Sequence, residues 1–181
     1  MEKFSTLKSQ AIPLNVANVD TDQIIPARFL KATDKKGFGD NVFRDWRYDK
    51  DQNLKPDFPL NNPKYSGSIL VAADNFGCGS SREHAVWALK EFGFRAVLAP
   101  SFADIFFGNC FKNGVLPIAL PEEVIDDLFK RVATGLTLSI DLRTQTLMDG
   151  EHVHNFEIDP ALKEKMLTGM DDIDLTLAEA E

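Results

Sequence analysis

Short apolar runs alternate with helical patterns in the middle of the chain. The runs 68–73, 96–99 and 115–118 are continuously apolar, which is typical of strands that are buried on both faces. Between them, apolar residues recur at helical spacing over about 81–92 and 102–111. Because strands that alternate with helices usually form a parallel sheet, this pattern predicts a parallel α/β core.

The chain before this core is less regular. Residues 8–14 can form a short strand, and a short helix is expected from Ile24 to Leu30, with Pro26 tolerated in its first turn. The stretch 33–65 is rich in proline, glycine and aromatic residues and has no clear periodicity. So long a connection is often a functional loop or lid. The alternative, which is compatible with the first, is an irregular excursion held in place by its aromatic side chains.

The C-terminal part predicts antiparallel strands. An acidic start suits a helix over about 122–134, and residues 136–142 alternate like a half-buried strand. Asp149-Gly150 is a strong signal for a two-residue hairpin turn between two further strands. We therefore expect residues 1–181 to form a single α/β domain with a mixed sheet and an acidic tail.

Composition excludes several classes of protein. Of the 181 residues, 44% are hydrophobic and 27% are charged, which is a globular rather than a disordered composition. The formal net charge of −8 argues against nucleic-acid binding, which needs a basic surface. No apolar run approaches the roughly 20 residues that span a bilayer, and the first residues contain no signal-peptide core. We therefore expect a cytoplasmic protein without nucleic-acid or membrane partners.

Two cysteines, Cys78 and Cys110, limit the redox and metal chemistry. An iron–sulfur cluster needs at least three thiolates, so the chain cannot hold one alone. Zinc is not excluded by counting, because His84, His152 and His154 are present. No tight Cys/His spacing marks a zinc site, however, and we expect the chain itself to bind no metal.

The strongest candidate site is the segment from Gly77 to His84, which reads Gly-Cys-Gly-Ser-Ser-Arg-Glu-His between a predicted strand and a predicted helix. Backbone amides at a glycine-rich turn collect anions, and two hydroxyls and a guanidinium at the same point can bind a carboxylate. The alternative is structural. Ser80 and Glu83 have the spacing of a capping box, which usually only starts a helix.

Other interpretations of this turn fit it less well. A dinucleotide fingerprint would have a third glycine where Arg82 stands, and the Gly-Lys-Ser/Thr of a phosphate loop does not follow. A stand-alone hydrolase could use Cys78 or Ser80 as nucleophile with His84. The simpler explanation is that Cys78 is a small residue in a tight turn and that His84 is satisfied by its neighbours.

Two further polar segments are weaker signals. The acids around Thr21 in Asp20-Thr21-Asp22 could orient a catalytic hydroxyl or pair with Arg82, but they could equally form turns with their own backbone. The segment 109–114 looks like a helix end with a glycine stop, and we expect it to be structural.

The residues nevertheless resemble one family closely. Segments 18–26 (Asn-Val-Asp-Thr-Asp-Gln-Ile-Ile-Pro) and 74–85 (Asp-Asn-Phe-Gly-Cys-Gly-Ser-Ser-Arg-Glu-His-Ala) are similar to the small subunit of 3-isopropylmalate dehydratase, in the aconitase superfamily. Shorter segments also match the bacterial members: 37–39, 45–47, 100–106 and 175–177. The likeness spans nearly the whole chain in the right order.

This resemblance implies the swivelling β/β/α domain of the aconitase type. It implies a hydro-lyase that interconverts 2-isopropylmalate and 3-isopropylmalate through 2-isopropylmaleate, in leucine biosynthesis. It also implies a separate large subunit with a four-iron–four-sulfur cluster, whereas this chain binds no cofactor itself. The ligand would be a small dicarboxylate.

The resemblance also implies residue roles. By its position in Gly-Ser-Ser-Arg, Ser80 resembles the catalytic base, and Ser81 and Arg82 resemble substrate-binding residues. Asp22 matches the active-site acid of the first motif and could hold Arg82 in place.

The segment after Pro26, with Arg28 and Lys31 as expected substrate-binding residues, differs between relatives of different substrate preference. A homoaconitate-type or citraconate-type dehydratase subunit therefore remains an alternative. A non-catalytic anion-binding module is a second one.

Overall fold

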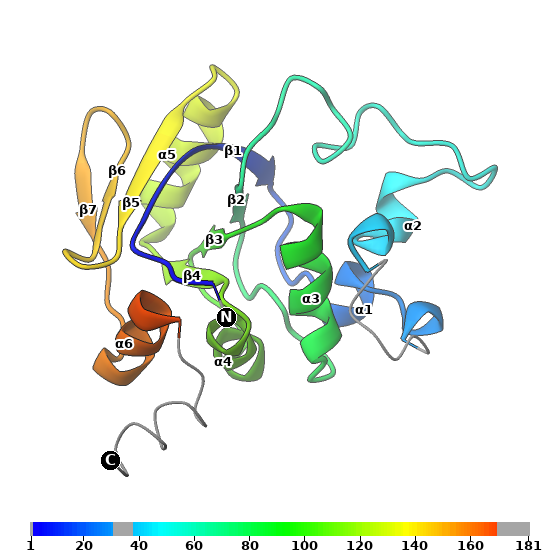
Figure 1. Ribbon diagram of the computed structural model, residues 1–181. Helices are drawn as coiled ribbons and strands as arrows, with labels where there is room; N and C mark the ends of the chain where they lie inside the picture. Colours follow the sequence, from blue (N-terminus) through cyan, green and yellow to red (C-terminus); the bar gives the residue numbers. More distant parts are fainter. Residues whose placement is uncertain (1, 31–37, 170–181) are drawn as a thin grey trace, which may run out of the picture.

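The computed structural model describes residues 2–30 and 38–169 (Figure 1). In this part of the chain the strands form one mixed sheet in the order β4-β3-β2-β1-β5-β6-β7. The strands are β1 (Thr6–Leu14), β2 (Ile69–Ala72), β3 (Ala96–Ala99), β4 (Leu116–Ala119), β5 (Thr137–Asp141), β6 (Thr146–Met148) and β7 (Val153–Asn155). The α-helices are α1 (Thr21–Ile24), α2 (Arg44–Arg47), α3 (Glu83–Phe92), α4 (Asp104–Lys112), α5 (Glu122–Val132) and α6 (Pro160–Thr168).

The predicted parallel core is confirmed. Strands β1 to β4 pair in parallel, and α3 and α4 connect β2 to β3 and β3 to β4. The antiparallel strands β5 to β7 extend the same sheet on the other side of β1. The mixed α/β sheet expected from the apolar pattern is therefore present.

Strand β1 joins the two halves of the sheet by changing its partner. Residues 6–10 pair with β5 in the antiparallel sense, and residues 11–14 pair with β2 in the parallel sense. Pro13 lies in the second part, where the described sheet has a partner on one edge of β1 only. A proline is tolerated at such a position because it removes only an amide that the ladder does not use.

Alternate side chains of the parallel strands enter two separate cores. Ile12 and Leu14 of β1, as predicted, share one face of the sheet, and they pack with residues of α3. Ala11, the residue before Ile12, points to the other side and belongs to the other core, which includes Leu128 of α5. Both faces of the parallel strands are thus covered, which explains their continuously apolar sequence.

The helix predicted from Ile24 to Leu30 is wrong in its bounds and continuity. Helix α1 begins earlier, where Asp20 caps the amide of Gln23 in a capping box, and it ends before Ile25. A 3-10 turn, Ala27–Phe29, follows Pro26. The break arises because the residue before a proline avoids the helical conformation, and Ile25 is indeed extended at φ −140°.

The described part of the long connection 33–65 is held in place by aromatic rings, as one of the two interpretations predicted. The rings of Phe43 and Trp46 stack, and Phe58 packs against both of them. The buried Arg47 side chain donates hydrogen bonds to three backbone carbonyls of this segment. Residues 31–37, and the acidic tail from 170 onward, lie outside the described residues.

The predicted hairpin forms between β6 and β7, but its turn lies one residue later than expected. The amide of Asp149 donates to the carbonyl of His152 at 3.1 Å, so that Gly150 and Glu151 are the central residues. Gly150 has a φ of +90°, which glycine adopts without strain. The backbone amide of Asp149 therefore closes the turn, and its side chain makes separate contacts that are described below.

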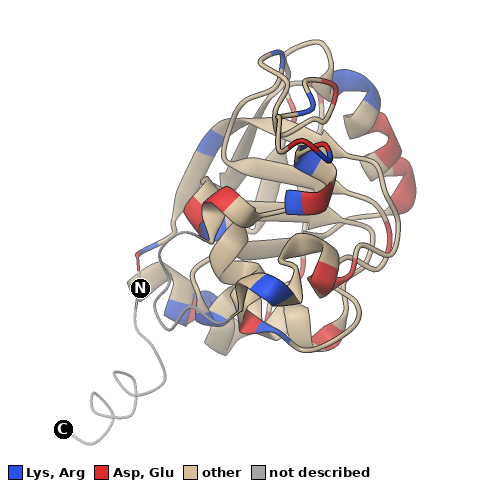
Figure 2. Cartoon of the chain, turned by 90° about the vertical axis from the view of Figure 1, so that its right-hand side faces the viewer, with Lys and Arg blue, Asp and Glu red and all other residues tan. Residues whose placement is uncertain are grey.

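Charge is distributed without a single dominant sign on the side that carries α1, α2 and α3. Figure 2 shows basic and acidic positions interspersed over this face. No helix among the described residues is both long enough and apolar enough to span a membrane.

Candidate active site

The candidate site is built from three segments that follow β1, β2 and β3. They are residues 18–22, 74–82 and 100–106. Because these strands are parallel, their carboxyl ends meet at one edge of the sheet, where ligands of α/β proteins usually bind. All three segments are ones that sequence analysis singled out.

The segment after β1 is bonded to the glycine-rich turn through backbone and hydroxyl groups. The amide of Gly77 donates to the carbonyl of Val19 at 2.7 Å, and the amide of Thr21 donates to the carbonyl of Cys78 at 2.8 Å. The hydroxyl of Thr21 donates to the carbonyl of Ser80 at 2.6 Å. These contacts fix one side of the turn.

The segment after β3 fixes the other side. The amide of Phe76 donates to the carbonyl of Ser101 at 3.1 Å, and the amide of Ala103 donates back to Phe76 at 3.1 Å. The hydroxyl of Ser101 accepts from the amide of Asn75 at 2.8 Å. Sequence analysis did not assign this role to Ser101, although its position directly after the strand 96–99 was a usable signal.

Gly77 allows the turn to approach α4 closely. Its φ is +83°, and a Cβ atom built on it would lie 2.2 Å from Cγ of the buried Phe106. Any other residue at this position would therefore have a strained backbone, and its side chain would clash with the ring of Phe106.

The capping-box interpretation of Ser80 is wrong. Helix α3 begins at Glu83, two residues later than predicted, and its N-cap is Arg82 in an extended conformation. The side chain of Glu83 instead accepts a hydrogen bond from Asn113 at 2.9 Å. The physical reason is that the Thr21 hydroxyl holds the Ser80 carbonyl, which keeps the chain extended before the helix. The side chains of Ser80 and Ser81 are left exposed.

The predicted pairing of Asp22 with Arg82 is present. Nη1 of Arg82 donates to Oδ1 of Asp22 at 2.9 Å, and the same oxygen accepts from the amide of Ala27 at 3.0 Å. The hydrogen bond from Arg82, followed by that from Ala27, lowers the pKa of Asp22 below its usual value. The Arg82 side chain is only 21% exposed, and its ion pair with Asp22 holds one end of the guanidinium in place.

A pocket of about 270 Å³ lies where the three segments meet. Its lining residues come from each of them: Thr21, Gly77, Gly79, Ser80, Ser81, Arg82, Ala103, Asp104, Ile105 and Phe106. The amides of Gly77 and Cys78 both donate to the carbonyl of Val19, so these two amides of the turn are not available to an anion. In the described part of the chain, no acceptor is paired with the amides of Gly79, Ser80 and Ser81. The residues that carry these amides, two of them with hydroxyls, line the pocket together with Arg82, which is a donor set suited to an anion.

The structure does not bring Arg28 into this pocket. Its guanidinium forms a two-pronged ion pair with Asp45, including Nη1 to Oδ2 at 3.0 Å, and it borders a different hollow of about 480 Å³. Lys31 lies outside the described residues. The expected substrate contacts of Arg28 and Lys31 therefore remain predictions.

Cys78 and His84, the nucleophile and base that a stand-alone hydrolase could use, each contact other residues. Sγ of Cys78 contacts the carbonyl of Asn18 at 3.4 Å, and the His84 ring packs against Phe38 and Trp87. These contacts agree with the simpler explanation of Cys78 and His84.

The chain's donor set does not fit an iron–sulfur cluster. Cys110, the other cysteine, is buried, and burial raises the pKa of its thiol. Two cysteines, one of them buried and held protonated, do not supply the thiolates that such a cluster needs.

Comparisons with known proteins agree with this architecture. The model of the Aconitase C-terminal domain family matches residues 1–123, and a second family model, LeuD_N, matches residues 126–160. The 3-isopropylmalate dehydratase small subunit of Roseobacter denitrificans is 55% identical over 98% of this chain and 90% of its own length. That of Lactococcus lactis subsp. lactis is 52% identical over 98% of this chain and 93% of its own.

A solved structure extends the comparison to the fold. The crystal structure of 3-isopropylmalate dehydratase from Methanocaldococcus jannaschii superposes with a TM-score of 0.71 at 29% identity. The match covers 97% of this chain and 95% of that one. The aconitase-type α/β fold expected from the sequence is thereby confirmed. The chain belongs to the family of 3-isopropylmalate dehydratase small subunits.

Proposed function

We propose that this chain is the small subunit of a hydro-lyase that interconverts 2-isopropylmalate and 3-isopropylmalate through 2-isopropylmaleate, in leucine biosynthesis. It works with a large subunit, on which we place the four-iron–four-sulfur cluster because this chain has only two cysteines. The names of the relatives and the geometry of the pocket support this proposal.

The observation that carries the proposal is the position of Arg82. Isopropylmalate is a dianion, and a chain with a net charge of −8 needs a local cation to bind it. Asp22 fixes the Arg82 guanidinium beside Ser80 and Ser81 at one pocket. A module that only bound anions would gain nothing from an acid opposite its arginine, so this pairing favours a site that positions its ligand.

In this proposal Ser80 is the base that takes the proton from the carbon beside a substrate carboxylate. A serine hydroxyl is normally far too weak a base for this step. The unpaired amides of the turn and the Arg82 guanidinium would stabilise its alkoxide, since preorganised donors favour a negative charge. Ser81 and Arg82 would bind a substrate carboxylate, and Asp22 would orient Arg82.

We further propose that residues 1–181 act as one domain. The two family matches divide the chain near residue 124, but β1 from the first part pairs with β5 from the second. One sheet therefore crosses the boundary between the matched regions.

Reconstitution tests the function. We expect the purified chain alone to be colourless and inactive, and we expect alkene formation from isopropylmalate after an iron–sulfur large subunit from the same cell is added. The ultraviolet absorbance of the alkene measures turnover. Iron and sulfide bound stoichiometrically to the isolated chain, with turnover, would contradict the proposal. A reconstituted complex that prefers a homoaconitate-type or citraconate-type substrate would move the chain to a related dehydratase.

Arg82→Lys is expected to lower kcat/KM by about tenfold or more, because lysine keeps the charge but loses the planar pair of donors. The matched control is Arg143→Lys, an exposed arginine in the turn between β5 and β6. Both variants are compared in complexes shown to be equally assembled. A loss of less than about threefold would mean that Arg82 is only an ion-pair partner of Asp22, of the kind worth about 0–1 kcal/mol.

A further inference from the structure

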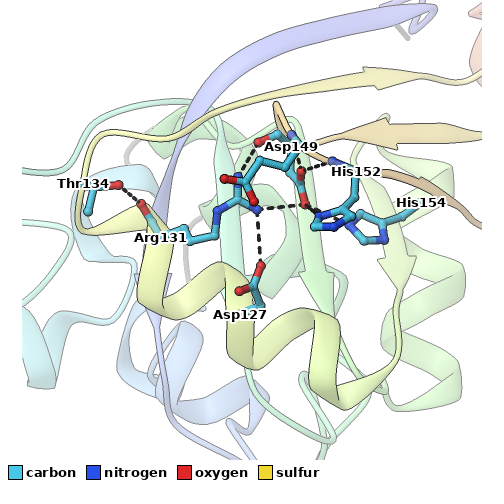
Figure 3. A network of polar contacts seen from close by, with 7 residues as sticks. Asp127, Arg131, Thr134, Asp149, His152 and His154 are labelled. Atoms are coloured by element: carbon cyan, nitrogen blue, oxygen red, sulfur yellow. Dashed lines mark hydrogen bonds and ion pairs between the residues drawn. The ribbon is translucent and has the colours of Figure 1, made fainter.

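A second cluster of chemistry-bearing side chains lies far from the pocket, where the β6–β7 hairpin meets α5 (Figure 3). It contains Asp149 from the hairpin turn, His152 directly before β7, His154 in β7, and Arg131 of α5. The dehydratase chemistry proposed above uses none of these residues.

The two histidines face the same carboxylate. Residues two apart in an extended chain point to the same side, and His152 and His154 have this spacing. Nε2 of His154 lies 2.9 Å from Oδ2 of Asp149, and Nδ1 of His152 lies 3.9 Å from the same oxygen. Figure 3 shows both imidazoles on one side of the carboxylate and Arg131 on the other.

The Asp149 carboxylate is held in a fixed position by the hairpin turn. Its side chain is 1% exposed, and Oδ1 accepts from the amides of Glu151 at 2.9 Å and His152 at 2.7 Å. The other oxygen, Oδ2, faces His154 at 2.9 Å and Arg131 at 3.0 Å. Oδ2 is thereby aimed at the histidines by a rigid turn.

We propose that Asp149, His152 and His154 form a binding site for zinc. One ligand atom from each residue lies within 4.8 Å of the other two. In a tetrahedral zinc site with nitrogen and oxygen ligands, neighbouring ligand atoms are about 3.3 Å apart. To reach this spacing, the 2.9 Å between Nε2 of His154 and Oδ2 of Asp149 must open and the 3.9 Å between Nδ1 of His152 and the same oxygen must close, each by about half an ångström. The His152 side chain is 65% exposed and has room to turn. Two imidazoles and a carboxylate are ligands that zinc accepts.

Arg131 competes with a metal ion for the Asp149 carboxylate. Its Nη1 lies 3.0 Å from Oδ2 of Asp149, and this ion pair neutralises part of the carboxylate's negative charge. It also contacts Asp127 at 3.3 Å and Glu151 at 3.9 Å, and it donates to the backbone carbonyl of Asp149 at 2.8 Å. Three carboxylates thus surround one guanidinium, so the cluster keeps a net negative charge that attracts a cation. If a metal took Oδ2 of Asp149, Arg131 would still have the other two carboxylates as partners.

Sequence analysis counted His152 and His154 as possible zinc ligands but did not connect them with Asp149. The carboxylate comes from a turn residue that was interpreted only as a hairpin signal. The usable signal was the pair His152-Val153-His154 directly after that turn, because alternation on a strand brings the two rings together.

The test is a titration of the purified chain with Co²⁺, a spectroscopic substitute for zinc, followed by competition with Zn²⁺. We expect saturable binding of one Co²⁺ per chain with visible d–d bands, and loss of those bands when Zn²⁺ is added. His152→Ala and His154→Ala should each weaken binding by at least about tenfold, because each removes one ligand. The matched control is His84→Phe, which removes the third histidine but keeps an aromatic ring against Trp87. It should bind Co²⁺ like the unchanged chain.

Arg131→Gln separates a metal site from a purely structural ion pair. If zinc competes with the guanidinium for Oδ2, this variant should bind Co²⁺ more tightly. Circular dichroism checks that each variant is folded, and the exposed His152 keeps the test decisive even if His154→Ala unfolds. Absence of saturable binding, binding unchanged in folded His152→Ala, or weaker binding by folded Arg131→Gln would each overturn the proposal.

Discussion

Ser80→Ala in the reconstituted complex is expected to slow turnover of isopropylmalate by about 10²–10⁴-fold, which is the usual contribution of a general base. The fold should be almost unaffected. Thr21 bonds the backbone carbonyl of Ser80 rather than its hydroxyl, and no described residue forms a hydrogen bond to that hydroxyl. We therefore expect the stability of the variant to change by less than about 0.5 kcal/mol.

The measurement is kcat and KM of complexes that are shown to be equally assembled. The control is Ser66→Ala, an exposed serine before β2, at the opposite end of that strand from the turn. It should leave both constants unchanged. Because α3 begins at Glu83 with Arg82 as its N-cap, Ser80 does not cap this helix. The prediction therefore concerns the chemical role of Ser80 alone. Turnover that is largely retained in folded Ser80→Ala would show that Ser80 is not the base.

Gly77→Ala is expected to destabilise the chain by about 2–5 kcal/mol. Two costs add at this position. A left-handed conformation costs an alanine about 1–2 kcal/mol, and forcing a methyl group into a packed core costs about 1–3 kcal/mol more. The new Cβ would lie 2.2 Å from Phe106, whose ring is itself packed against Phe76.

Gly135→Ala separates these two costs. Gly135 has a φ of +86°, almost the same as the +83° of Gly77, but a Cβ atom there would meet nothing within 4 Å. Urea unfolding of both variants should therefore show about 1–3 kcal/mol more destabilisation for Gly77→Ala. Equal losses would mean that α4 moves away without cost, and that the turn is not fixed by close packing.

The sequence predicted the elements of the core better than their ends. Apolar runs placed β2 and β3 almost to the residue, because strands buried on both faces leave an unambiguous pattern. The start of α3 was misplaced because the spacing of Ser80 and Glu83 satisfies a local rule. The contact that overrides it comes from Thr21, 59 residues away, and no local pattern contains that information.

The candidate site shows the same division. The pairing of Asp22 with Arg82 was one of three options open from the sequence, and the fold brings the two together across 60 residues. By contrast, the ion pair of Arg28 with Asp45 was not foreseen, since the sequence around Asp45 has no periodicity that would place it beside the turn of Arg28. Packing partners such as Phe106 under Gly77 were also missed, because close approach depends on tertiary structure.

The change of partner along β1 has a consequence for synthesis on the ribosome. This strand is made first, but the strands that pair with it begin only at Ile69 and Thr137. Neither half of the sheet can close around β1 until those later residues have emerged, and such distant pairings form slowly. Arg82 can therefore meet Asp22 only after β2 has reached β1. We expect nascent chains that stop before Ile69 to leave the first 30 residues without a folded partner, and so to be cleaved readily by added protease.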